Sequence, residues 1–208
     1  MLIILGVVAL DLFEVNIIEP ILPANNFTYI LRSFEGDIGY WFSQHWIPAL
    51  LYFFVMIYIA VYPFTLWFSP IYFIITNNKK SMKTIAYGAF LIYIIALPFY
   101  LFFPVTNVYT YYHVESPLEI VIPSVENFFY STTTQNNCFP SLHTAFTILI
   151  AYTISLTDNK RLKYFAYSIS ILVIISVIYL AIHWIMDVIA GIALSLGVIL
   201  LLKKTLKE

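Results

Sequence analysis

The chain contains six apolar stretches, each close to the roughly 20 residues that a helix needs to cross the hydrocarbon core of a bilayer. Hydrophobic residues make up 62% of its 208 residues and charged residues only 10%, whereas soluble domains average about 45–50% and about 25%. So little polar surface cannot cover a water-soluble globule. We therefore predict an all-α membrane protein, a six-transmembrane-helix bundle formed as a single domain over residues 1–208, with spans at 1–22, 47–75, 85–104, 140–157, 162–182 and 184–202.

The basic residues predict how this bundle is oriented. In a six-span arrangement, three basic clusters lie on the same side, and cytoplasmic loops are enriched in Lys and Arg. Both termini are then cytoplasmic, and the opposite, extracytoplasmic side keeps only Arg32. The clusters are Lys79, Lys80 and Lys83; Lys160, Arg161 and Lys163; and Lys203, Lys204 and Lys207.

Charge and cysteine content exclude other classes of protein. The net charge of −1 excludes a basic nucleic-acid binder. Cys138 is the only cysteine, so no internal disulfide can form, and a cysteine-based zinc site is not expected. Two long outer segments, 23–46 and 105–139, exceed simple turns. The first is rich in aromatic residues, which suits either a helix lying in the membrane interface or an ordinary connector.

Polar residues stand at the start of the predicted fourth span. Pro140 suits the first turn of a helix, where its missing N–H group has no intrahelical role. Ser141, Leu142 and the free N–H groups of this turn would then form an anion site, with His143 beside them. The alternative is that the serine and histidine only satisfy a helix end.

A second polar pair opens the sixth span. His183 and Asp187 are four residues apart, so they lie on one helical face. Asp187 can accept a hydrogen bond from one ring nitrogen of His183, which fixes the tautomer and leaves the other nitrogen basic. The alternative is a structural buried pair.

Both pairs lie at the outer ends of their helices, so they can meet at one depth. Two histidines beside an anion site suit phosphoryl transfer, in which His183 attacks phosphorus and His143 protonates the departing oxygen. Metal binding is the rival interpretation, because two histidines and one aspartate can bind zinc or iron(II). No further strong ligand is evident near Ser141.

Two motifs carry a family resemblance. Pro140-Ser141-Leu142-His143 resembles the P-S-x-H signature of the type 2 phosphatidic acid phosphatase superfamily, and Ser176 through Asp187 resembles its S-R-x5-H-x3-D signature. The resemblance implies a membrane-embedded enzyme that needs no metal or other cofactor. It implies His183 as nucleophile, Asp187 as its partner, His143 as general acid and Ser141 as a phosphate ligand.

The chain also departs from this family. Val177 stands where the third signature has Arg, and the first signature, K-x6-R-P, is absent. Phe103-Pro104, with the missing arginine, resembles the inositol phosphorylceramide synthase branch, in which an alcohol can accept the phosphoryl group. Arg32 is the only outer basic residue, so by elimination we predict it as the phosphate-binding cation. Otherwise Arg32 anchors a helix, and backbone N–H groups with Asn137 hold the phosphate.

The sequence thus predicts metal-independent phosphoryl transfer on a lipid phosphate or diphosphate, at the extracytoplasmic face of the cell membrane. The predicted partners are the bilayer and a lipid phosphate substrate, with no nucleic acid. The alternatives are a lipid phosphotransferase with an alcohol acceptor and a non-catalytic transporter or lipid-binding scaffold. Asp11 and Glu14, within the first span, are interpreted as structural.

Overall fold

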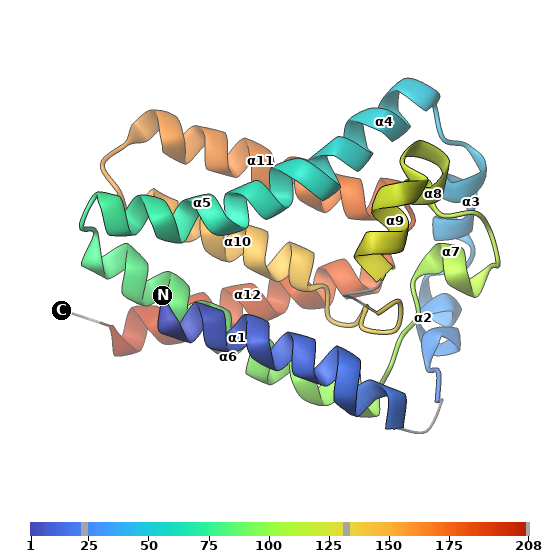
Figure 1. Cartoon of the computed structure of the whole chain (residues 1–208), viewed down its shortest axis with the longest axis horizontal. Coiled ribbons are helices and arrows are strands. Elements are labelled where there is room, and N and C mark those ends of the chain that lie inside the picture. Colours follow the sequence, from blue (N-terminus) through green and yellow to red (C-terminus); the bar gives the residue numbers. More distant parts are fainter. Residues whose placement is uncertain (22–24, 131–133, 207–208) are drawn as a thin grey trace.

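A computed structural model of the chain describes residues 1–21, 25–130 and 134–206 (Figure 1). These residues form helices joined by turns, with a single isolated bridge between Val105 and Asn137 and no strand among the described residues. The helices are α1 (Leu2–Phe13), α2 (Thr28–Glu35), α3 (Ile38–Gln44), α4 (Pro48–Met56), α5 (Tyr62–Ile75), α6 (Lys79–Phe102), α7 (Val108–Tyr111), α8 (Pro117–Val121), α9 (Pro123–Tyr130), α10 (Leu142–Ser155), α11 (Lys160–Tyr179) and α12 (Ile185–Thr205).

Four helical segments of the described chain are long and apolar enough to cross a membrane. They are Pro48–Ile75, α6, α11 and α12. The first joins α4 to α5 through the π-helical turn η3 (Ile57–Val61), just before Pro63. These four correspond to the predicted spans 47–75, 85–104, 162–182 and 184–202, except that α6 and α11 begin earlier and carry their lysines in the first turns.

The other two predicted spans take different forms. α10 covers 14 residues of the predicted span 140–157 and is apolar but shorter than the other four. α1 covers 12 residues of the predicted span 1–22 and continues through the π-helix η1 (Glu14–Ile18) and the 3₁₀ turn η2 (Glu19–Ile21). Residue 22 lies outside the described residues, as does Lys207 of the third basic cluster.

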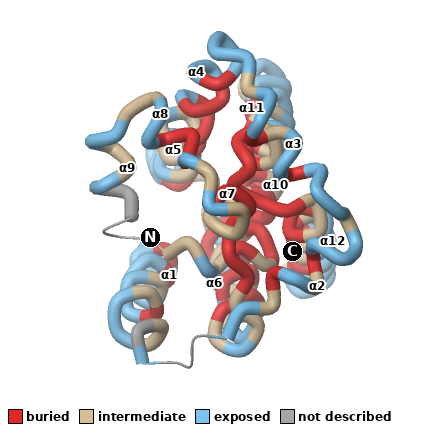
Figure 2. Tube along the Cα trace, turned by 90° about the vertical axis from the view of Figure 1, so that its right-hand side faces the viewer, coloured by how far each residue is buried: buried red, intermediate tan, exposed pale blue. Residues whose placement is uncertain are grey.

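α10 is the central helix of the bundle. It packs against α5, α6, α11 and α12, while α1 packs on α6. Ala145, Leu149 and Ile154 are among its buried residues and belong to a hydrophobic core that extends to α6 and α12. Figure 2 shows buried segments through the middle of the molecule and exposed segments around it. The outward faces of the long helices are nevertheless apolar, as lipid contact requires; Ile75, Phe102 and Leu200 are examples.

The short helices gather at one end of the bundle. α2 and α3 fill the predicted segment 23–46, and α7, α8 and α9 lie within the predicted segment 105–139. In Figure 1 these helices lie at the right-hand end, opposite the two chain termini. The starts of α10 and α12, next to which the predicted signature residues lie, face this same end.

Candidate active site

The start of α10 is built around Ser141. Ser141 is the N-cap residue, and its hydroxyl oxygen accepts a 3.3 Å hydrogen bond from the backbone N–H of Thr144. The N–H groups of Leu142 and His143 have no carbonyl one turn earlier in the helix to bond with, so they are available to an anion. The expectation for Pro140 was wrong, because the helix begins only at Leu142 and Pro140 precedes its cap.

A tight turn presents His183 at the end of α11. The backbone N–H of Ile182 donates to Val177 O at 3.1 Å, and that of Ala181 donates to Ile178 O at 3.0 Å. With Ala181 at φ 55°, these bonds form a Schellman-type helix end. The N–H of His183 also donates to Val177 O at 3.0 Å. Val177, where the family signature has Arg, is thus a buried residue near the end of α11, and its carbonyl oxygen positions the histidine.

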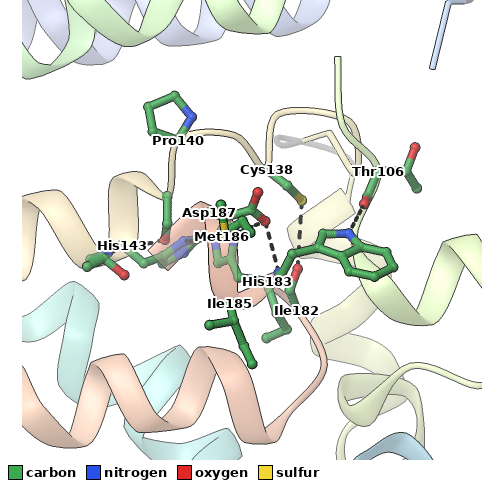
Figure 3. Close-up of polar contacts among 12 residues, drawn as sticks. Thr106, Cys138, Pro140, His143, Ile182, His183, Ile185, Met186 and Asp187 are labelled. Atoms are coloured by element: carbon green, nitrogen blue, oxygen red, sulfur yellow. Dashed lines mark hydrogen bonds and ion pairs between the residues drawn. The ribbon is translucent and has the colours of Figure 1, made fainter. Parts of the chain in front are cut away.

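His143, His183 and Asp187 form a continuous relay (Figure 3). His183 Nδ1 lies 3.2 Å from Asp187 Oδ2, and His183 Nε2 lies 3.1 Å from His143 Nδ1. The predicted His183–Asp187 hydrogen bond is therefore present. If Asp187 is ionised, His183 carries its proton on Nδ1, and Nε2 keeps a lone pair toward His143. The sequence brought these residues to one depth, and the structure brings them into direct contact.

Backbone groups hold Asp187 in place. The N–H of Trp184 donates to Asp187 Oδ2 at 2.9 Å, and the N–H of Ser141 donates to the Asp187 backbone carbonyl at 3.1 Å. Gly191 allows this close approach of α12 to α10, because a Cβ atom there would lie 2.6 Å from Ser141 O.

The N-terminus of α12 is capped from outside the helix. Both carboxylate oxygens of Glu35, the last residue of α2, accept hydrogen bonds, from the backbone N–H groups of Ile185 at 2.8 Å and Met186 at 3.1 Å. Burial raises the pKa of the Glu35 carboxyl, although the two N–H groups oppose this. Sequence analysis missed this contact, because nothing local relates a residue in a short outer helix to one 150 positions later.

A cavity of about 360 Å³ opens beside the relay. Its lining includes His143 and His183, and the rings of Tyr58 and Tyr62 stand about 5 Å from the His143 ring. Tyr58 lies in η3, whose wider π-helical turn commonly marks functional sites. Most of the remaining lining is aliphatic or aromatic, and the described residues that line it include no Lys or Arg.

The first helix forms another part of this cavity. Asp11 and Asn137 are among its lining residues, and Asn137 Nδ2 donates a 2.8 Å hydrogen bond to Glu14 Oε2. Asn137, predicted as a phosphate ligand, therefore already uses one of its two amide N–H donors on Glu14. The contact of Glu14 with Asn137 was also missed by sequence analysis.

Arg32 is engaged away from the relay. Its Nε donates to Asp37 Oδ1 at 3.0 Å, and its guanidinium lies 5.5 Å from the centre of the Tyr112 ring. Hydrogen bonds from Tyr112 and Arg32 lower the pKa of the Asp37 carboxyl. The Arg32 side chain is 46% exposed and is not among the cavity-lining residues. Its role as a phosphate ligand stays a prediction, and that role requires it to leave Asp37.

Cys138 lies beside two residues of the relay, His183 and Asp187. The ligand atoms of Cys138, His183 and Asp187 all lie within 4.8 Å of one another, which is close enough to hold a metal ion. The metal site considered from the sequence used two histidines and one aspartate and did not include Cys138. However, burial raises the pKa of the Cys138 thiol well above its ordinary value, and metals bind the thiolate form. The geometry thus permits a metal, the binding of which would require loss of the thiol proton.

Comparison with known proteins decides the family. The model of the PAP2 superfamily matches residues 32–201, more than half of the chain. The chain belongs to the PAP2 superfamily. This membership supports a membrane protein with phosphatase-type phosphoryl transfer, and it confirms the family that the two signatures indicated.

Comparison with curated proteins and with solved structures says less about this chain than the family model does. The chain is similar to an uncharacterized protein of Methanocaldococcus jannaschii, with 36% identity over 88 residues, which are 41% of this chain and 36% of the relative. The match thus spans about a third of the relative's length. No solved structure matches the chain.

Proposed function

We propose that this PAP2 protein is a lipid phosphatase that transfers the phosphoryl group of a lipid phosphate or diphosphate to water through a phosphohistidine at His183. The relay from Asp187 through His183 to His143, with heteroatom distances of 3.2 and 3.1 Å, is the observation that carries this proposal. It gives His183 an oriented proton on one nitrogen and a lone pair on the other.

The reaction would run in two displacements. In the first, His183 Nε2 forms a bond to phosphorus while the bond from phosphorus to the lipid oxygen breaks, and His143 gives its proton to that oxygen. In the second, His143 takes a proton from water, the oxygen of which bonds to phosphorus as the nitrogen–phosphorus bond breaks. Free phosphate and unmodified His183 result.

The substrate must part the two histidines. A 3.1 Å separation is one hydrogen bond and leaves no room for a phosphorus atom between the rings. The exposed side of His143 toward the cavity allows it to turn onto the leaving oxygen. The N–H groups of Leu142 and His143, with the Ser141 hydroxyl, are proposed to hold the phosphoryl oxygens where charge develops.

The membrane placement is part of the proposal. Six spans with both termini in the cytoplasm would set the relay at the extracytoplasmic face, and the basic clusters support this arrangement. The bundle geometry supports this, since α10 and α12 start toward the end that carries the short helices, and the two termini lie toward the other end (Figure 1). The shorter α10 would begin below the surface, beneath the short helices.

Phosphate release from a panel of lipid phosphates and diphosphates, in detergent, tests this function. We expect release from at least one lipid without added metal and unchanged by a chelator. Loss of activity on chelation, restored by zinc, would replace the proposal with a metal site at Cys138, His183 and Asp187. Transfer to an added alcohol in place of phosphate release would change the acceptor from water and make the protein a phosphotransferase.

A further inference from the structure

One wall of the cavity is acidic and faces the relay across a largely apolar space. Asp11 on α1 and Asn137 in the loop before α10 line the same cavity as His143 and His183. Glu14 stands behind Asn137, one turn after Asp11, and is 1% exposed. Glu14 opens the π-helical turn η1, a local distortion that places it against the loop rather than in lipid.

Three polar atoms of this wall have no hydrogen-bond partner. They are Glu14 Oε1, Asn137 Oδ1 and the hydroxyl oxygen of Tyr93. Tyr93 is 1% exposed, and it lines the cavity on α6, so it is independent of the first helix. Buried polar atoms without partners are costly, and the Asn137 carbonyl oxygen and an ionised Glu14 carboxylate can only accept. A ligand that donates hydrogen bonds would satisfy them.

The acidic and aromatic residues around the cavity indicate which kind of hydrogen-bond donor it can bind. Asp11 lines the cavity, Glu14 lies behind it against Asn137, and no Lys or Arg of the described chain is among the lining residues. The rings of Tyr58, Tyr62, Tyr100 and Trp67 are also part of the lining. Carboxylates combined with aromatic faces attract a cation rather than a neutral hydroxyl. The unpartnered acceptors need N–H donors, which a primary ammonium has and a quaternary ammonium lacks.

We propose that Asp11, Glu14, Asn137 and Tyr93 form a subsite for a primary ammonium group of the lipid phosphate substrate. This inference rests on the proposed function and names the substrate class, an aminated lipid phosphate that carries its own positive charge. Such a zwitterion reduces the need for the basic phosphate ligands that the family signatures have and this chain lacks. The ammonium can belong to the lipid backbone beside a phosphomonoester or to the ethanolamine headgroup of a phosphodiester, from which the same two displacements would release phosphoethanolamine in place of free phosphate.

Binding to the His183→Ala variant tests the subsite without turnover. Two matched lipid pairs are compared, each differing only by ammonium against hydroxyl: a 2-amino and a 2-hydroxy long-chain alkyl phosphate, and phosphatidyl lipids with ethanolamine or ethylene glycol as headgroup. Hydrogen bonds to charged groups contribute enough for about a tenfold or greater preference. We expect the ammonium lipid of one pair to bind about tenfold more tightly, and the pair that responds identifies its source.

The preference should depend on the acidic wall. Glu14→Gln and Asp11→Asn, each combined with His183→Ala, should bring the two lipids of the responding pair to nearly equal affinity. Asn16→Ala is the control, since Asn16 lies on the same segment, is exposed and bonds only to Leu12 O of its own helix. Thermal unfolding of each variant checks that it is folded.

Two results would overturn the inference. One is equal affinity for the ammonium lipid and the hydroxyl lipid in both pairs, which would show that the acidic wall does not bind the ammonium group. The other is a preference that persists in both acidic-wall variants. Neither result depends on catalysis. If the unmodified protein hydrolyses none of the lipids, the proposed function is refuted, and the binding measurements still test the subsite.

Discussion

The two walls of the cavity are constructed in different ways. His143, His183 and Asp187 stand at the starts of α10 and α12, where helix caps, a Schellman-type turn and one close glycine contact fix them. On the other wall, Glu14 meets Asn137 across 123 positions of sequence, and unpartnered acceptors remain. On the first wall, both ring nitrogens of His183 and the Oδ2 atom of Asp187 are paired, although Asp187 Oδ1 has no partner. Such pairing of the reacting groups is what pre-organised chemistry requires. The second has groups still open to a ligand, which suits recognition.

The largest effect should come from breaking the relay wall. His183→Ala should reduce phosphate release about 10⁴-fold or more, because it removes the atom that forms the covalent intermediate. Asp187→Asn keeps the shape but loses the charge that orients the ring, and about 10²- to 10⁴-fold loss is expected. Initial rates of folded variants are the measurement. By contrast, Glu14→Gln should leave the rate on a hydroxylated lipid within about tenfold; equal losses on both walls would erase the distinction between them.

Arg32→Ala provides a test of intermediate size. If Arg32 binds the phosphate as predicted, Arg32→Ala should lower turnover about 10²-fold or more. Arg32→Lys should restore turnover only in part. Asp37→Asn is the matched variant, since it frees Arg32 from its ion pair and should not reduce turnover. If Arg32→Ala keeps near-normal rates, Arg32 only stabilises the short helices at its end of the bundle. The start of α10 at Ser141 then holds the phosphate without Arg32.

Much of the relay wall could be predicted from sequence. His183 and Asp187 are linked by a four-residue spacing, and Ser141 and His143 by their place at a helix start, so local geometry already brings each pair together. The helix register failed only at Pro140, which lies before the cap. The four long spans could be predicted because hydropathy is a local property of the sequence. The predicted first and fourth spans contain shorter α-helices: α1 continues into a π-helix and a 3₁₀ turn, and α10 lies in the centre of the bundle.

The acidic wall and the outer cap could not be predicted in this way. Glu14 to Asn137 and Glu35 to Met186 are contacts between segments more than 100 positions apart. No periodicity or motif relates such residues, and a single sequence contains no pairing information for them. The sequence favoured a structural role for Glu14, because a buried carboxyl group often has all its hydrogen bonds satisfied within the protein. The unpartnered Glu14 Oε1 atom becomes evident only from the fold.

The smallest effect should come from the contact that joins α10 to α12. Gly191→Ala places a Cβ atom 2.6 Å from Ser141 O, so the helices must separate. Overpacking of this kind costs about 1–3 kcal/mol, and the relay should widen with it. Gly197→Ala is the control on the same helix, with no atom within 4 Å of the new Cβ. It should be neutral or slightly stabilising, since alanine favours helices.

Thermal unfolding in detergent and phosphate release measure this pair of variants. Gly191→Ala should unfold at a lower temperature and lose about tenfold or more in rate, because misplacement of reacting groups by a fraction of an ångström is costly. Equal behaviour of the two alanine variants would mean that the close contact at Ser141 is unimportant for the relay.

The central claim is that His183 becomes covalently phosphorylated, and trapping the intermediate tests it most directly. A lipid substrate labelled at phosphorus is mixed with protein, the reaction is stopped in alkali, which preserves phosphohistidine, and the labelled residue is located by peptide mass spectrometry. We predict label on His183 in the unmodified protein, more of it in His143→Ala, where breakdown is slowed, and none in His183→Ala. Phosphate release by the unmodified protein without label on His183, or label that survives in His183→Ala, would contradict the account.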